Sequence, residues 1–216
     1  MKTLLPLIVI VCLMLIPCSD FSQQKVSFRP ELGSPKNITQ WDIDGSGLWT
    51  IREGTLVLFK AGVPAGPIRR PAACAILRTP VLQRVTVEAE IRSTAPLDVV
   101  RRDLDFVIAY ESPTRFYYVH LAGIADNVHN GIFLVNNADR VRIDSGTGKP
   151  QLTDTAWHHI RVEHDGSSGR IRVFADSTRA PVLEAVDTTI AYGRAGFGSF
   201  DDTGVFRHIK VTGTTR

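Results

Sequence analysis

Short runs of alternating apolar and polar residues recur along most of the chain, separated by turn-forming residues. Clear examples are RVTVEAEIR (84–92), LDFVIAY (104–110), FYYVHLA (116–122) and RIRVFA (170–175). The separating stretches include DGSG, ESPT, NNAD and DGSSG. A side-chain period of two is typical of strands with one buried face, and no segment after the N-terminus has helical periodicity. About a dozen such runs predict an all-β protein, a sandwich or barrel of antiparallel strands.

The pattern also predicts how two strand pairs align, because a shift of one residue would turn every apolar side chain to the wrong face. In the later pair, matching the apolar faces sets Val162 opposite Val173. The same alignment sets Glu163 opposite Arg172, a cross-strand charge pair that contributes up to about 1 kcal/mol.

The earlier pair joins 103–110 to 115–122 through the loop ESPT. Its apolar faces match when the pairs are Leu104–Leu121, Phe106–Val119, Ile108–Tyr117 and Tyr110–Arg115. The opposite face then carries Asp105 directly across from His120, and Val107 across from Tyr118. This second face is therefore aromatic and ionisable.

The pair formed by Asp105 and His120 is the strongest candidate for chemistry. A carboxylate beside an imidazole raises the imidazole pKa and orients the ring, which suits a general base or a partner for sugar hydroxyls. Phe116 and Tyr118 share this face and are expected to form a platform for a sugar ring. The alternative is an ordinary cross-strand ion pair on a solvated sheet face.

His129 and Asn130 open the next predicted strand, and one of them joins this face. If Ile132 and Leu134 point to the core, His129 lies near His120. If the alternate residues of that strand point inward, Asn130 takes the place instead. The pattern is equally apolar in both cases, so both alternatives remain open.

Other carboxylates offer weaker candidates. Glu88 lies on one face of the strand RVTVEAEIR together with a second glutamate, and paired carboxylates can serve as acid and base. Loop residues such as Asp126 and the pair Asp201–Asp202 supply oxygen ligands that suit Ca²⁺. Aspartates in such loops more often form turns. We therefore expect either no cofactor or a structural Ca²⁺, and the sequence does not identify a metal site.

The N-terminus resembles a secretory signal over residues 1–18, with Lys2 followed by the apolar run LLPLIVIVCLMLI. This run is short for a membrane span, and no second apolar run follows, so no integral membrane span is expected. Residues 19–39 are expected to hold a leader and the first strand, and 40–213 the folded domain. We expect a secreted or periplasmic protein, with lipid anchoring through Cys18 as the less favoured alternative.

Charge and motifs exclude several functions. The formal net charge of +3 is too balanced to predict nucleic-acid binding. Cys74 is the one cysteine beyond the signal region, so neither an internal disulfide nor a thiolate metal site is expected. The chain has no GxSxG, HExxH, ExDxxE or Gly-rich phosphate loop, which disfavours a serine hydrolase, a zincin and an ordinary laminarinase-type glucanase.

The C-terminal half carries a family resemblance. WHHIRVEHDGSSGRIRVFADS (157–177) and the later stretch GRAGFGSFDDTGVFRHIKV (193–211) resemble concanavalin A-like lectin/glucanase domains. The likeness is greatest to the secreted bacterial 3-keto-disaccharide hydrolase-like group and more distant to laminin G-type modules. It implies a single jelly-roll sandwich of two antiparallel sheets, with sugar commonly bound on the concave one.

Three functional hypotheses follow. The first is recognition of an oligo- or polysaccharide outside the cytoplasm, with Asp105, Tyr118 and His120 on the concave face. The second is cleavage of a 3-keto-glycoside with His120 as base and His129 or Glu88 as its partner. The third is a non-catalytic interaction module of the cell envelope.

Overall fold

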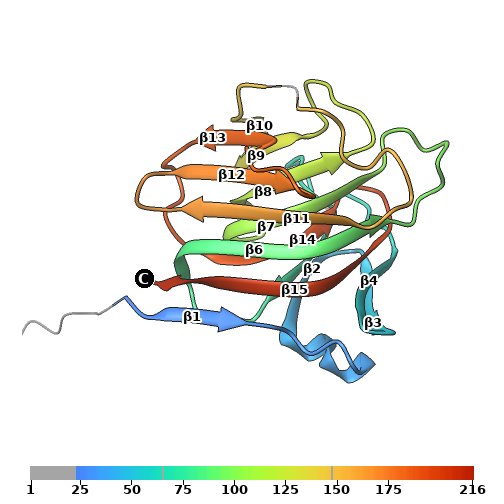
Figure 1. Ribbon diagram of the computed structural model, residues 1–216, viewed down its shortest axis with the longest axis horizontal. Helices are drawn as coiled ribbons and strands as arrows, with labels where there is room; N and C mark the ends of the chain where they lie inside the picture. The colour runs from blue at the N-terminus through green and yellow to red at the C-terminus, as the bar shows by residue number, and fades with distance from the viewer. Residues whose placement is uncertain (1–22, 65, 147) are drawn as a thin grey trace, which may run out of the picture.

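The computed structural model describes residues 23–64, 66–146 and 148–216, which form two stacked antiparallel β-sheets (Figure 1). The predicted all-β jelly-roll sandwich is confirmed. Within the described residues, one short 3₁₀ helix, η1 (Pro35–Gln40), precedes β2. The expected signal segment 1–18 lies outside the described residues. In the part of the chain that is described, no helix has the length and apolar character needed to cross a membrane.

The eight-stranded sheet has the order β13-β12-β11-β6-β15-β4-β3, and β1 pairs with the later half of β15. The long strands β6 and β15 lie side by side at its centre (Figure 1). The strands of this sheet are β1 (Lys25–Phe28), β3 (Leu48–Arg52), β4 (Thr55–Lys60), β6 (Leu82–Ser93), β11 (His158–Asp165), β12 (Arg170–Ala175), β13 (Leu183–Val186) and β15 (Gly204–Thr215).

The seven-stranded sheet has the order β10-β9-β8-β7-β14-β5-β2 and packs behind the first in Figure 1. Its central strands β8, β7 and β14 carry most of the residues considered below. The strands are β2 (Trp41–Gly45), β5 (Ala73–Leu77), β7 (Asp103–Ser112), β8 (Arg115–Ala122), β9 (Gly131–Asn136), β10 (Val141–Arg142) and β14 (Arg194–Ser199).

The main core fills the space between the sheets. Alternate side chains of β6, such as Val87 and Ile91, face Phe106 and its neighbours across the interface. The Phe197 ring lies at the centre, with its centroid 5.0 Å from that of Phe106 and 4.6 Å from that of Phe206. The period of two in the sequence follows from this arrangement, because successive side chains of a strand point to opposite faces.

Most of the predicted alignment is confirmed. Val162 pairs with Val173 and Glu163 with Arg172, while Asp105 pairs with His120 as expected.

The end of the β7–β8 hairpin differs from the prediction. Tyr110 does not pair with Arg115, because a bulge inserts extra residues into β7 and Ser112 takes that position. Ala109 at the bulge has a positive φ of 49°, which leaves the regular strand conformation. The bulge turns Tyr110 to the outer face of the sheet, where its ring stacks 5.6 Å from that of Phe116. The turn is therefore two residues long instead of four.

The edges of the sandwich extend beyond the expected range 40–213. The strand β1 lies within 19–39, the range expected to hold a leader and the first strand, and its residues pair with the end of β15 from Val211 to Thr214. Because β15 itself continues to Thr215, both ends of the described chain belong to one sheet.

Candidate functional site

The outer face of the seven-stranded sheet carries a second apolar cluster. Phe116 and Tyr118 of β8 are fully buried in it, beside Val107 of β7 and Phe133 of β9. The Tyr118 and Phe133 rings stack with their centroids 5.2 Å apart. Contrary to expectation, Phe116 and Tyr118 therefore offer no exposed surface on which a sugar ring can stack, because neighbouring connections cover them.

Three side chains contribute to this cover, and we call Ile68, Arg140 and Phe200 the roof. Ile68 comes from the β4–β5 connection and packs on the apolar cluster. Arg140, from the β9–β10 connection, places its guanidinium 4.3 Å from the Phe200 ring centroid and donates a 2.9 Å hydrogen bond to the Tyr118 hydroxyl. The two connections are joined, because the Arg140 backbone N–H donates to the Arg69 carbonyl at 3.1 Å.

Asp105 and His120 lie beneath the roof. His120 Nδ1 is 2.8 Å from Asp105 Oδ1 and 3.7 Å from Asp103 Oδ2, and all three side chains are buried. Among the described residues, His120 Nε2 and Asp105 Oδ2 have no hydrogen-bond partner. We call Asp103, Asp105 and His120 the buried cluster.

Burial determines the charge of this cluster. It lowers the pKa of His120 to about 4, although the nearby Asp103 carboxylate acts in the opposite direction. Burial likewise raises the pKa of Asp105 well above its usual range. Both shifts favour the neutral forms of Asp105 and His120. The sequence-based expectation of a raised imidazole pKa is wrong, because loss of hydration outweighs the carboxylate.

The buried cluster also presents donor atoms that a divalent cation can bind. One donor atom from each of its members lies within 4.8 Å of the others, and Asp103 meets Asp201 and Asp202 in the same way. The first set mixes imidazole with oxygen and suits a transition metal, whereas the second is all oxygen and suits Ca²⁺. The unpartnered Asp105 Oδ2 fits such a role. The expected Ca²⁺ stays a prediction.

His129 lies beside the buried cluster. Ile132 points into the main core, so the first of the two predicted patterns holds for β9. The His129 ring centroid is 5.7 Å from that of His120. Asp126 Oδ1 lies 2.8 Å from His129 Nδ1 and accepts the His129 backbone N–H, so this aspartate orients the ring and closes a turn.

Asn130 has a structural role in the connection after β10. Its side chain is buried, and its amide donates to the carbonyl oxygens of Gly148 and Lys149 at 3.2 and 3.0 Å. Its φ of 52° also fits asparagine, which tolerates the left-handed region. These contacts anchor the connection, and Asn130 does not lie on an accessible face as a sugar-binding residue would.

Glu88 does not meet His120. It lies on the outward face of β6 in the eight-stranded sheet, where its carboxylate is 3.4 Å from Lys210 Nζ. His120 lies on the outer side of the other sheet, so the whole core separates the two side chains. The expectation that Glu88 assists His120 is therefore wrong, because strand alternation cannot show which sheet a strand joins.

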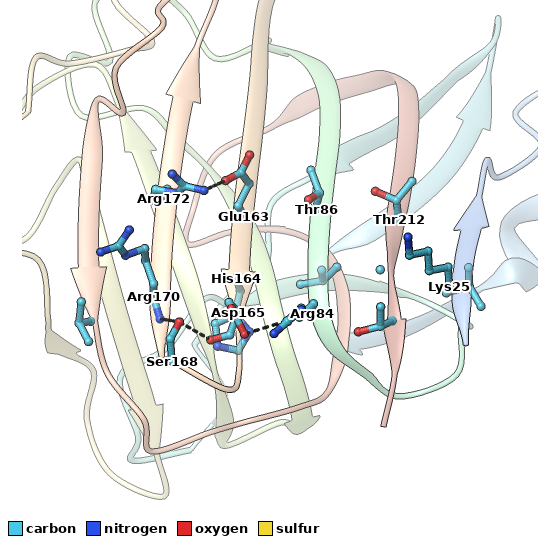
Figure 2. A pocket seen from close by; sticks show the side chains of 15 residues that line it. Lys25, Arg84, Thr86, Glu163, His164, Asp165, Ser168, Arg170, Arg172 and Thr212 are labelled. Atoms are coloured by element: carbon cyan, nitrogen blue, oxygen red, sulfur yellow. Dashed lines mark hydrogen bonds and ion pairs between the residues drawn. The ribbon is translucent and has the colours of Figure 1, made fainter. Parts of the chain in front are cut away.

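A groove with a volume of about 800 Å³ crosses the outer face of the eight-stranded sheet (Figure 2). One cross-strand row of its lining runs from Arg172 and Glu163 through Thr86 to Thr212. The two threonines are shorter than Arg172 and Glu163 in the same row, which hollows the surface. We call this feature the polar groove. It is lined by Lys25, Val26, Arg84, Val85, Thr86, Glu163, His164, Asp165, Ser168, Arg170, Arg172, Val186, Thr212, Gly213 and Thr214.

Ion pairs hold the charged side chains of the polar groove in place. Arg172 lies 2.7 Å from Glu163 Oε2, and Arg84 Nε lies 3.2 Å from Asp165 Oδ1, as the dashed lines in Figure 2 show. Hydrogen bonds from Ser167 and the Arg84 charge lower the pKa of Asp165 to about 2, so this carboxylate stays ionised. The groove therefore presents fixed donors and acceptors beside threonine hydroxyls.

The sequence predicted the Glu163–Arg172 pair but not the polar groove. Its lining comes from strands at opposite ends of the chain, because β1 and β15 pair beside β6 and β11. Asp103 was not chosen as a site residue, although the predicted alignment puts it on the same face as Asp105 at a spacing of two residues. The roof had no sequence signal, since Arg140 and Phe200 lie in connections.

No protein-family model matches the chain, and no curated protein matches it. Solved structures do resemble it. The carbohydrate-binding module CBM66 from Bacillus subtilis matches with a TM-score of 0.60 at 17% identity, covering 79% of this chain and 94% of that one. Winged bean acidic lectin, solved with methyl-α-D-galactose, has a TM-score of 0.62 at 12% identity, with 90% and 100% covered.

A Bacillus subtilis protein of unknown function with a galectin-like fold is also similar, with a TM-score of 0.59 at 13% identity over 90% of this chain and 99% of that one. At these identities the likeness concerns the fold. The concanavalin A-like sandwich expected from the sequence is thereby confirmed, while the resemblance to the 3-keto-disaccharide group stays a prediction.

Proposed function

We propose that this protein binds a glycan and that the polar groove is its binding site. The observation that carries the proposal is the groove itself, in which paired arginines and carboxylates lie beside the hydroxyl groups of Thr86 and Thr212. Sugar hydroxyls both donate and accept hydrogen bonds, so they match a surface that offers both in fixed positions. Similar folds in a carbohydrate-binding module and a galactose-bound lectin add support.

This proposal keeps the glycan-binding hypothesis but moves the site to the other sheet. The expected site at Asp105, Tyr118 and His120 is buried, whereas the polar groove is open to solvent. Secretion and a periplasmic location remain part of the proposal, because the expected signal segment is their support. The ligand would then be an oligo- or polysaccharide met outside the cytoplasm.

A glycan array tests the proposal, with one variant that fills the groove. Thr86→Phe places a large side chain on the groove floor and suits a strand position. We expect the protein to bind one class of glycan and the variant to lose that binding. Thr50→Phe on β3 is the matched control, because this residue is part of the same sheet but not of the groove lining. Unchanged binding by Thr86→Phe would contradict the proposal.

A second candidate function rests on the Asp105–His120 hydrogen bond. A neutral imidazole is the form that a general base requires, and His129 lies close enough to serve as the acid. His120 would take the proton from the carbon beside the keto group of a 3-keto-glycoside, while the acid protonates the leaving oxygen. Substrate can reach His120 only if Arg140 and Phe200 move aside.

Release of sugar from a 3-keto-glucoside tests this candidate. We expect His120→Ala to abolish release. Equal release by the parent protein and this variant would show that any activity arises elsewhere.

A further inference from the structure

Cationic side chains recur at a regular interval across the polar groove. In the row nearest the β11–β12 turn, the outward residues on β12, β11, β6, β15 and β1 are Arg170, Asp165, Arg84, Thr214 and Lys25. Neighbouring strands lie about 4.8 Å apart, so each cation stands roughly 10 Å from the next one along the row. Figure 2 shows Arg170, Arg84 and Lys25 in this order across the sheet.

The cations are more exposed than the carboxylates that pair with them. The exposed fraction of the side chain is 55% for Arg84 against 38% for Asp165, and 41% for Arg172 against 21% for Glu163. An arginine has five N–H donors, and one ion pair engages only some of them. The carboxylates therefore hold the guanidinium groups in position and leave donors directed to solvent.

Positive charge exceeds negative charge along the groove lining. Four cations and two carboxylates line it, which leaves an excess of two positive charges. Glu184 lies near one end of the groove, 3.7 Å from Arg170, and reduces this excess without removing it. The six charged lining residues are Lys25, Arg84, Arg170, Arg172, Glu163 and Asp165.

We propose that the ligand of the polar groove is an acidic polysaccharide with anionic groups, carboxylate or sulfate, spaced along an extended chain. This inference rests on the glycan-binding function proposed above. Arg170, Arg84 and Lys25 bind successive anionic groups, and the arginines provide the fork of N–H donors that matches such groups. Asp165 and Thr214 alternate with the cations and bind the hydroxyl groups of the sugars between them.

Matched pairs of oligosaccharides test the inference. The set contains oligogalacturonate, hyaluronan and chondroitin sulfate fragments, each beside the same fragment with its carboxylates reduced or its sulfates removed. We expect at least one acidic member to bind, and its neutral partner to bind at least about tenfold more weakly. A tenfold difference corresponds to the loss of one charge-assisted hydrogen bond. The carboxylate and sulfate members identify which anionic group is recognised.

Variants locate the binding in the groove. Arg84→Gln and Lys25→Gln each remove one charge of the row, and we expect each to weaken binding by roughly tenfold. Arg179→Gln and Lys60→Gln are the matched controls, because both residues are exposed and lie outside the groove lining. Binding should also weaken as salt rises from about 0.1 M to about 1 M, since exposed charges are screened. Lys25 lies at the exposed start of β1, so its variant should fold normally.

The outcomes separate the two proposals. Equal binding of an acidic fragment and its neutral partner overturns the acidic ligand and leaves glycan binding in place. Acid-selective binding that Arg84→Gln and Lys25→Gln leave unchanged overturns the role of this row. An array with no binding at all, neutral or acidic, overturns the proposed function itself.

Discussion

His164 should make the fold lose stability when the pH falls below neutral. Its side chain points inward from β11 and is 2% exposed, with its ring centroid 5.6 Å from that of Tyr117. Neither ring nitrogen has a hydrogen-bond partner among the described residues. Burial therefore disfavours the charged imidazolium, and it lowers the pKa of His164 from 6.5 to about 4.

The sign and the size of the effect follow from this pKa. The folded state has the lower pKa, so the unfolded chain takes up the proton first as the pH falls, and the folded state loses stability. The loss begins near pH 6.5 and is complete near pH 4. A shift of this size corresponds to about 3 kcal/mol in total, of which about 2 kcal/mol is lost by pH 5.

Urea unfolding followed by tryptophan fluorescence measures the effect, at about pH 7.5 and about pH 5. His164→Leu replaces the imidazole with an apolar side chain of similar size that cannot titrate. We expect its unfolding free energy to fall by about 2 kcal/mol less than that of the parent protein over this pH range. His120 titrates equally in both proteins, so its contribution cancels. His159→Gln, at an exposed position on the same strand, is the control.

An equal loss of stability in the parent protein and His164→Leu would refute the reasoning. It would mean that His164 reaches solvent or a partner in the folded state, so that its pKa is close to that of the unfolded chain. A larger loss in the variant would refute it as well, because it would mean that the pKa of His164 is higher in the folded state than in the unfolded chain.

Substitutions at Asp105, Tyr117 and Gly166 test the packing, each by urea unfolding. Asp105→Asn should lower the free energy of unfolding by less than about 1 kcal/mol, because an amide can keep a neutral hydrogen bond. Asp105→Ala should lower it by about 2 kcal/mol, and equal losses in the two variants would indicate a charged pair. Tyr117→Phe should cost about 1–3 kcal/mol, because the buried Ile190 N–H donates to this hydroxyl at 2.9 Å; a neutral change would contradict that contact. Gly166→Ala should cost more than about 3 kcal/mol, since its Cβ would lie 1.7 Å from a backbone oxygen. Gly33→Ala, with open space, should be nearly neutral.

The register of the strands within the predicted hairpins could be predicted from the sequence, because it depends on residues that are close together along the chain. Asp105 meets His120, and Glu163 meets Arg172, because apolar alternation allows one register for each pair. The exception lies at Tyr110, where the bulge at Ala109 changes the face of the strand. A bulge at an alanine has no clear pattern in the sequence, since positive φ is typical of glycine and asparagine.

The burial of the candidate site could not be predicted from the sequence. The strand pattern correctly placed Phe116, Tyr118 and His120 on the side opposite the main core. Whether that side is open depends on Arg140 and Phe200, which come from connections distant in sequence. Because these residues cover the face, the expected sugar platform is a buried apolar cluster. The same burial lowers the pKa of His120.

By itself, then, the sequence of this protein determined its fold class, the strands and the partners within its hairpins. These properties follow from a side-chain period of two and from turn residues, which act over a few positions. Only the tertiary structure decided that Glu88 and His120 lie on opposite sheets, that the roof closes one outer face, and that β1 and β15 help to line a charged groove on the other. Those outcomes depend on which strands become neighbours in space, and the local hydrophobic pattern of a strand does not determine its neighbours.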